Sequence, residues 1–387
     1  MSKQLVYATG ICICIYSVPC LGYDPLSALF DLEKSHFVDI ESSHEGRVIP
    51  LLISLPKKKG PLPVTLFSHG LGGSRTGCEY IRTYWTERGY ATIFLQHPGS
   101  DESLVHGLSS IQALRNLRSA ATRKKLNLRV GDVTDVLDAI ATWNSDKRSP
   151  FYCRLNINKM GLAGHSMGAR TAQLIIGQQG WLGTTKKDMR IRAAVVMSPS
   201  SPSLRSAKSA FGSVATPCLL LTRTRDSVPL LSDQSVDSRR AVFPALPSGN
   251  AYELVLHNAT HSAFTEKSRK HEPPHNPKHH RSIETITTAS WDAYLQSNKE
   301  AKMAQRGRSK KRDRPRGHLA DKLNSEPTSA ETMTRSLGDA FSPHSFPIFC
   351  RRLGDRTTDI ITYGKCHIKI LIWIFMVKKM VPSTELI

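Results

Sequence analysis

The sequence lacks any apolar run long enough to cross a bilayer as a helix. The two candidates, Leu5–Pro19 and Ile368–Val377, are both shorter than the ~20 residues that such a helix needs. The first follows Lys3 and precedes small residues, which is the layout of a secretory signal peptide, so residues 1–22 are predicted to be a leader. No clean small-x-small cleavage triplet is present. We therefore expect a secreted or periplasmic protein, with a cytoplasmic location as the alternative.

The chain also lacks the cysteine and histidine spacing of a disulfide framework or a metal site. Of its eight cysteines, three lie in the predicted leader and two near the C-terminus. The remaining three, Cys78, Cys153 and Cys218, are odd in number and far apart. Four histidines occur close together without an acidic cluster and at irregular spacing: His271, His275, His279 and His280. We expect neither a metal ion nor a cofactor.

Acidic residues are scarce, with 32 Asp and Glu against 53 Lys and Arg, a formal net charge of +21. From Ala301 onward there are 17 Lys and Arg but only 8 Asp and Glu, so nine charges of this excess belong to the C-terminal part. This uneven distribution argues against a nucleic-acid groove in the rest of the chain.

Residues 305–387 form a basic tail without hydrophobic periodicity, which predicts disorder. The alternative is a separate module that contacts an anionic membrane surface or nucleic acid.

Between these terminal segments, short apolar runs alternate with segments of helical periodicity. The expected strands are Arg47–Pro56, Pro63–Ser68, Ala91–Gln96, the short run from Met160 that leads into Gly164, Ala193–Met197, Pro217–Thr222 and Ala251–His257. The expected helices are Cys78–Arg88, Val130–Trp143, Ala169–Gly177 and Ile283–Ala304. This alternation predicts one α/β domain over residues 38–304, with a mostly parallel sheet and helices on both faces.

The most informative stretch is Gly164-His165-Ser166-Met167-Gly168, a Gly-x-Ser-x-Gly motif between a predicted strand and a predicted helix. In that setting a sharp turn exposes the serine at the carboxyl edge of the sheet. The turn leaves no room for side chains at the two glycine positions. Ser166 is therefore the candidate nucleophile.

A serine hydroxyl needs a general base, and the base needs an acid to orient it. In such sheets the order along the chain is serine, acid, histidine. Asp226 lies just after the strand that begins at Pro217, and His261 just after the strand Ala251–His257. The carboxyl ends of parallel strands share the edge where ligands bind, so these two residues are the candidate acid and base. Asp233, Asp237 and, for the histidine, His257 are the competitors.

Hydrolysis of an ester also requires two N–H donors for the oxyanion. One is expected from Met167, the residue after the nucleophile. The other is expected from Leu71, in the glycine-rich loop His69-Gly70-Leu71-Gly72-Gly73 after the strand Pro63–Ser68. His69 precedes Ser166 in the chain and is interpreted as a support for this loop rather than as the base.

Several of these stretches together resemble one group of proteins. Ser68–Gly73, His97–Asp101, Gly164–Gly168, Thr222–Pro229 and His257–Phe264 are similar to the predicted dienelactone-hydrolase group related to platelet-activating-factor acetylhydrolases, over about Val38 to Ala304. The resemblance implies an α/β-hydrolase fold. It places the nucleophile at Ser166, the acid and histidine at Asp226 and His261, and the oxyanion amides at Leu71 and Met167. Dienelactone hydrolases use a cysteine nucleophile, so Ser166 favours an ester over a lactone substrate.

The sequence thus predicts a serine carboxylic-ester hydrolase that acts on a small or short-chain ester, including acetyl esters derived from phospholipids. The alternative is a non-catalytic protein of the same fold that binds a ligand or partner. The sequence predicts no oligomeric state.

Overall fold

The computed structural model describes residues 23–44, 46–180, 183–226, 234–266, 276–306, 347–352 and 359–362. The predicted leader and most of the predicted tail, including Ile368–Val377, lie outside these ranges, so the expectations for them stay predictions. Within the described part, no helix is both long and apolar enough to cross a membrane.

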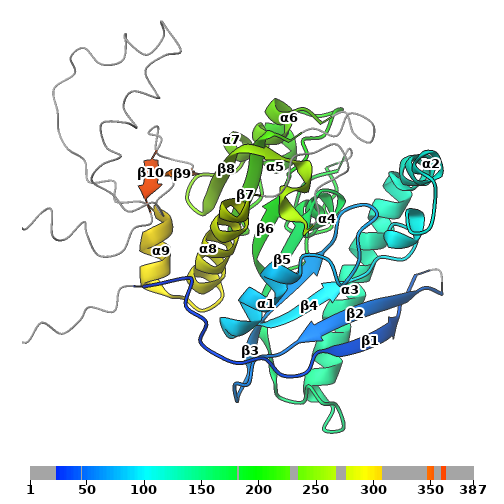
Figure 1. Ribbon diagram of the computed structural model, residues 1–387, viewed down its shortest axis with the longest axis vertical. Helices are drawn as coiled ribbons and strands as arrows, with labels where there is room; N and C mark the ends of the chain where they lie inside the picture. The colour runs from blue at the N-terminus through cyan, green and yellow to red at the C-terminus, as the bar shows by residue number, and fades with distance from the viewer. Residues whose placement is uncertain are drawn as a thin grey trace, which may run out of the picture. The chain divides into compact units, whose positions relative to one another are not determined.

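A twisted sheet forms the centre of the chain, in the order β1-β2-β4-β3-β5-β6-β7-β8-β9-β10 (Figure 1). Strands β4, β3, β5, β6, β7 and β8 run parallel, while β1, β2, β9 and β10 pair antiparallel. The strands are β1 (His36–Glu41), β2 (Val48–Ser54), β3 (Leu62–Ser68), β4 (Ala91–Leu95), β5 (Leu155–His165), β6 (Ile191–Met197), β7 (Cys218–Arg225), β8 (Ala251–Thr260), β9 (Pro347–Arg352) and β10 (Asp359–Thr362).

Helices cover both faces of this sheet, which confirms the predicted α/β-hydrolase fold class. One face carries α1 (Glu79–Glu87) and α8 (Pro277–Tyr294), and the other carries α3 (Arg123–Ser145) and α4 (Met167–Ile175). The remaining helices are η1 (Glu102–Leu104), α2 (Ser110–Ala120), α5 (Ala207–Phe211), α6 (Val236–Arg240), α7 (Val242–Ala245), η2 (His261–Phe264) and α9 (Lys299–Arg306).

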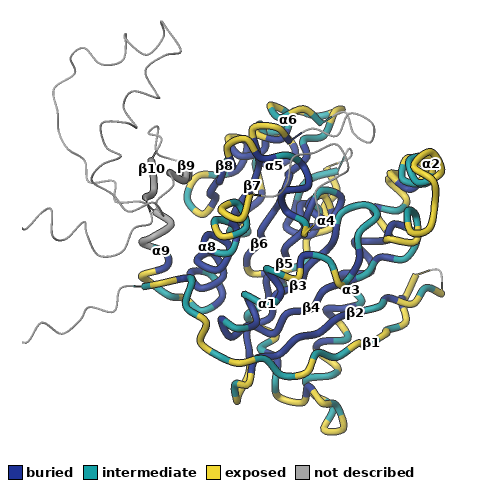
Figure 2. The backbone as a smooth tube through the Cα atoms, viewed as in Figure 1, coloured by how far each residue is buried: buried dark blue, intermediate teal, exposed yellow. Residues whose placement is uncertain are grey.

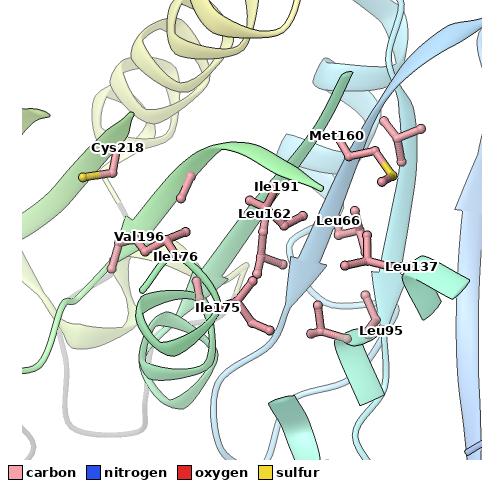
Figure 3. Close-up of a cluster of buried hydrophobic side chains, with 14 of the residues drawn as sticks. Leu66, Leu95, Leu137, Met160, Leu162, Ile175, Ile176, Ile191, Val196 and Cys218 are labelled. Carbon is pink, nitrogen blue, oxygen red and sulfur yellow. The ribbon is translucent and has the colours of Figure 1, made fainter. Parts of the chain in front are cut away.

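Two apolar cores, one on each face, hold these layers together. The core under α3 and α4 includes Leu66, Leu137, Leu162, Ile175 and Val196, drawn in Figure 3. The strands that supply it are dark along nearly their whole length in Figure 2, because they are buried on both faces. Burial on both faces explains why these strands appear in the sequence as continuous apolar runs without alternation.

The predicted closing helix Ile283–Ala304 is wrong as a single element, because α8 and α9 are separate. Ser297 adopts a positive φ of 60°, which a continuous right-handed helix does not allow. Asn298 then accepts a hydrogen bond from the Ala301 N–H at 3.0 Å and so begins α9. The helical periodicity of the sequence continues across this turn, so the sequence does not predict the break.

The structure also has more helix before Val130 than the predicted helix Val130–Trp143 includes. Helix α3 begins at Arg123, and α2 precedes it with a capping box in which Ser109 and Gln112 satisfy each other's backbone N–H groups. A Ser-x-x-Gln sequence is a signal for such a start. Of the tail, the structure describes only the end of α9, β9 and β10, with β9 paired to β8.

Candidate active site

The turn between β5 and α4 holds Ser166 in a strained conformation. Its backbone has φ 55° and ψ −110°, where a non-glycine residue is rarely found. A Cβ atom on Gly164 would overlap the main chain of Gly168, and one on Gly168 would overlap the carbonyl of Ser68. The two glycines are thus required by close backbone packing, and the turn lifts the Ser166 side chain off the end of the sheet.

The candidate acid and base come from the ends of two neighbouring strands. Asp226 directly follows β7, and His261 directly follows β8 as the first residue of η2. His261 Nε2 lies 3.0 Å from Ser166 Oγ, and His261 Nδ1 lies 2.7 Å from Asp226 Oδ1. The structure therefore brings the three predicted side chains into one hydrogen-bonded chain, with the spacing that proton transfer requires.

Burial and charge set the protonation states in this chain. Burial raises the pKa of Asp226, but Arg223, the hydrogen bond from His261 and Arg239 together hold that pKa below its usual range. Burial lowers the pKa of His261 to about 4, against the raising effect of its bond to Asp226. At neutral pH His261 is then neutral, its Nδ1–H donates to Asp226, and its Nε2 accepts the Ser166 hydroxyl proton.

Two buried arginines hold the candidate acid in place, and the sequence interpretation missed both. Arg223 on β7 donates to Asp226 Oδ2 at 2.8 Å and to the main-chain oxygen of His261 at 2.5 Å. Its guanidinium also lies 3.8 Å from the ring centre of Phe264. Arg239 on α6 donates to the main-chain oxygen of Asp226 at 3.0 Å and lies 3.3 Å from its Oδ1. A charged residue in an apolar strand was the available signal for Arg223, because buried arginines are rare unless paired.

The two predicted oxyanion donors, the N–H groups of Leu71 and Met167, have no acceptor among the described residues. The loop that carries Leu71 is fixed at either side, since Gly72 N–H donates to the Ser100 carbonyl at 3.0 Å and Gly73 N–H to the Gly70 carbonyl at 3.1 Å. Gly70 packs against Ser166, with 3.5 Å between the position of a Cβ on Gly70 and Ser166 Cβ.

The competing candidates occupy other positions. Asp237 is exposed on α6, and His257 is exposed near the end of β8, where its carbonyl accepts a bond from His279 Nε2 at 3.1 Å. Asp233 lies outside the described residues. His69 is buried, and its ring bonds to the Gly70 carbonyl and the His97 N–H, with no bond to Ser166 among the described residues.

No metal-binding cluster of three or more His, Cys, Asp or Glu occurs in the described ranges. Of the four clustered histidines, His280 stacks on Tyr80 with ring centres 3.9 Å apart, and His279 Nε2 donates to the His257 carbonyl. His271 and His275 lie outside the described ranges, so the expectation of no metal stays a prediction.

A comparison with protein families supports the class that this fold and site define. A model of a family described as PET hydrolase-like (PETase) matches residues 118–271. The match spans Ser166, Asp226 and His261 but not Leu71. A search of curated proteins found no significant match. Fold and family match together place the chain among the α/β-hydrolases. Within that class it is a serine hydrolase of the carboxylic-ester type.

Proposed function

We propose that the chain hydrolyses small carboxylic esters through a covalent acyl-enzyme formed on Ser166. The single observation that carries this proposal is the hydrogen-bonded order Ser166, His261, Asp226 at 3.0 Å and 2.7 Å. Ser166 also lies in a Gly-x-Ser-x-Gly turn at the edge of a sheet, which is the structural context in which such a serine acts as a nucleophile.

The reaction would run in two halves. In the first, His261 Nε2 takes the hydroxyl proton as Ser166 Oγ attacks the ester carbonyl, and the Leu71 and Met167 amides stabilise the oxyanion. The C–O bond to the alcohol breaks, and His261 returns the proton to that leaving group. In the second half, water attacks the acyl-enzyme with His261 again as base, and the acid product and free Ser166 result.

Asp226 would hold the imidazole in the tautomer with Nδ1 protonated and would stabilise the imidazolium that forms. Its two arginine contacts keep it ionised for that purpose. No step needs a metal ion or an organic cofactor.

The substrate that we propose is a short-chain ester, including the acetyl esters of phospholipid origin. This finer proposal depends on the likeness of Ser68–Gly73 and Gly164–Gly168 to the dienelactone-hydrolase and platelet-activating-factor acetylhydrolase group. A series of p-nitrophenyl esters from acetate to octanoate tests it. Rising kcat/KM with chain length would contradict it.

The central experiment measures covalent labelling and turnover in the same preparation. A fluorophosphonate probe should modify Ser166, and p-nitrophenyl acetate should be hydrolysed. Ser166→Ala should lose both, with kcat lower by about 10⁴-fold or more. Ser200 is a buried serine in the loop after β6, so Ser200→Ala is the matched control and should keep both the labelling and the turnover. A properly folded chain that neither turns over esters nor takes the label would favour the ligand-binding alternative.

We also propose that the protein is exported, because Lys3 and the apolar run Leu5–Pro19 have the layout of a signal peptide. Sequencing the N-terminus of the protein recovered outside the cytoplasm tests this. Recovery only from the cytoplasm, with Met1 or Ser2 intact, would contradict it.

A further inference from the structure

We propose that His69 is a positioning residue of the oxyanion hole, whose ring fixes the direction of the Leu71 N–H by holding the carbonyl of Gly70. This inference rests on the function proposed above. It goes beyond the sequence interpretation of His69 as a support for the loop, because it names the carbonyl that the ring holds and the N–H that this orients.

The argument begins with one planar peptide unit. The Gly70 C=O and the Leu71 N–H belong to the same trans peptide and point in opposite directions. His69 Nδ1 lies 2.6 Å from the Gly70 oxygen, and the Gly73 N–H donates to that same oxygen at 3.1 Å. Turning the Leu71 N–H away from its present direction would break both bonds. The ring of His69 therefore acts on a donor that it does not touch.

The tautomer of His69 is fixed by its other nitrogen. The backbone N–H of His97 donates to His69 Nε2 at 3.0 Å, so Nε2 carries no proton. Burial, with the nearby Arg129 and His97, lowers the pKa of the ring well below its ordinary value, so the ring is neutral. Its one proton is then on Nδ1 and is donated to Gly70.

Arg129 supports this arrangement from the other side. Its Nη2 lies 3.2 Å from His69 Nδ1, but a protonated Nδ1 cannot accept from it. Arg129 donates instead to the main-chain oxygen of His69. Both the ring of His69 and its peptide are thus held.

His97, which supplies the N–H that fixes this tautomer, sits in a second Ser-His-Asp chain. Ser68 Oγ is 2.9 Å from His97 Nε2, and His97 Nδ1 is 2.8 Å from Asp132 Oδ2. Arg47 pairs with both oxygens of Asp132, at 2.8 Å and 3.0 Å. The side chains of Ser68, His97 and Asp132 are fully buried, so no ester reaches them. Their hydrogen bonds hold His97 in the position from which its backbone N–H meets His69.

Two substitutions separate the nitrogens of His69. Asparagine places its amide nitrogen near the position of Nδ1 and keeps a donor for the Gly70 carbonyl. Glutamine reaches to the position of Nε2 and keeps an acceptor for the His97 N–H but loses the donor. We expect His69→Gln to lower kcat on p-nitrophenyl acetate by about 10²–10³-fold, the effect of losing one oxyanion donor. We expect His69→Asn to stay within about tenfold of the unsubstituted chain, and both to leave KM nearly unchanged.

A trifluoromethyl ketone inhibitor gives a second measurement, because its adduct with Ser166 carries the oxyanion. Its affinity should fall in His69→Gln and be kept in His69→Asn, at equal thermal unfolding midpoints. A purely structural role for His69 would affect both variants by their loss of stability. Equal losses of kcat, or a larger loss in His69→Asn, would overturn the inference while the proposed function stands.

The unsubstituted protein tests the same point where the variants do not fold. In ¹⁵N-histidine-labelled protein, the ring signals of His69 should show a protonated Nδ1 and an unprotonated Nε2. The opposite tautomer would overturn the inference. An unsubstituted chain without esterase activity or Ser166 labelling would instead remove the proposed function, and this role for His69 with it.

Discussion

At the scale of single residues, the charges around Asp226 define the acid side of the site. Arg223 and Arg239 are both buried against one carboxylate, so two positive charges lie beside Asp226 even while His261 is neutral. The two cations stabilise the ionised acid, and they also disfavour a positive charge on His261. The site should therefore keep its base unprotonated in acidic solution.

The first prediction concerns the pH dependence of this base. Because burial lowers the pKa of His261 to about 4 and only the neutral ring accepts the Ser166 proton, kcat/KM should be level at neutral pH. It should be lost as the pH falls through about 4. A profile of p-nitrophenyl acetate hydrolysis between pH 3 and 8, at ~0.1 M constant ionic strength to limit changes in screening, measures it. An acid limb near the ordinary histidine value would contradict it.

The second prediction assigns part of that low pKa to Arg239. Replacing it in Arg239→Gln removes a positive charge that lowers the pKa of His261, so the acid limb should move to higher pH. Arg239→Lys keeps the charge and should leave the limb in place.

Arg240→Gln is the matched control for this shift. Arg240 neighbours Arg239 on the chain, but its side chain is 44% exposed and pairs with Glu253 at 3.9 Å. Its removal should not move the limb. An identical shift in both glutamine variants would show that general surface charge, and not the contact with Asp226, sets the profile.

The candidate nucleophile and its two hydrogen-bonding partners could be predicted at this scale, but the residues that support them could not. Ser166 follows from a motif with a steric reason, and Asp226 and His261 follow from their places after two strands. Arg239 enters from α6, thirteen residues beyond Asp226, and no local pattern links the two. The tautomer of His69 depends on a backbone N–H 28 residues away. Such contacts are set by tertiary packing, which periodicity and spacing do not encode.

At the scale of elements, the turn from β5 to α4 is held by contact between main chains. Gly168 lies in the first turn of α4, and it packs against the carbonyls of Ser68 and His69. This contact joins the nucleophile turn to the end of β3, the strand that leads into the oxyanion loop. Two parts of the site are therefore fixed to each other by backbone packing alone.

The third prediction tests this contact. Gly168→Ala places a methyl group into the Ser68 carbonyl, so the free energy of unfolding should fall by about 3 kcal/mol or more through overpacking. Alanine is otherwise the better helix former by about 1 kcal/mol, so a loss has the opposite sign to the propensity effect. Denaturant unfolding measures the change.

Gly77→Ala serves as the control in the same assay. A Cβ on Gly77 would meet only the Ser74 oxygen, at 3.4 Å, an ordinary contact. Its unfolding midpoint should stay close to that of the unsubstituted protein. If Gly168→Ala were equally stable, the close approach of α4 to β3 would not be a constraint on the turn.

The elements themselves were largely predictable because the buried strands are apolar throughout. The failures have local causes. The break between α8 and α9 depends on the positive φ of one residue, Ser297. A serine in the sequence does not predict that conformation. Strand β1 escaped notice because its residues alternate between exposed and half-buried positions and include no continuous apolar run.

At the scale of the whole molecule, the site residues all come from the described domain. Ser68, Asp226 and His261 are buried, and Leu71 and Ser166 are half-buried. Helix α9 ends at Arg306, and the domain boundary at residue 304 stays a prediction.

The fourth prediction separates that tail from catalysis. A chain that ends at Arg306 should hydrolyse p-nitrophenyl acetate with kcat/KM within about twofold of the full chain, because a small ester needs only local contacts. It loses the pairing of β9 with β8, so its thermal midpoint is measured alongside. Loss of activity in a chain that still unfolds cooperatively would place part of the site in the tail.

Vesicles of anionic lipid, mixed with the same two chains, test the alternative that the basic tail contacts an anionic membrane surface. The full chain should sediment with the vesicles at low salt and be released as ionic strength rises, since the interaction is electrostatic. The shortened chain should bind less. Equal sedimentation of both would assign the binding to the domain and not to the tail.

The two Ser-His-Asp arrangements in this molecule use the same residue types at nearly the same distances, 3.0 Å and 2.7 Å in one and 2.9 Å and 2.8 Å in the other. A geometric template for the triad would therefore return two hits in this one polypeptide. Solvent contact is what distinguishes them: Ser166 reaches the surface, and Ser68 does not. Exposure to solvent, and not the arrangement of the three side chains, is therefore what makes Ser166 and not Ser68 the candidate nucleophile.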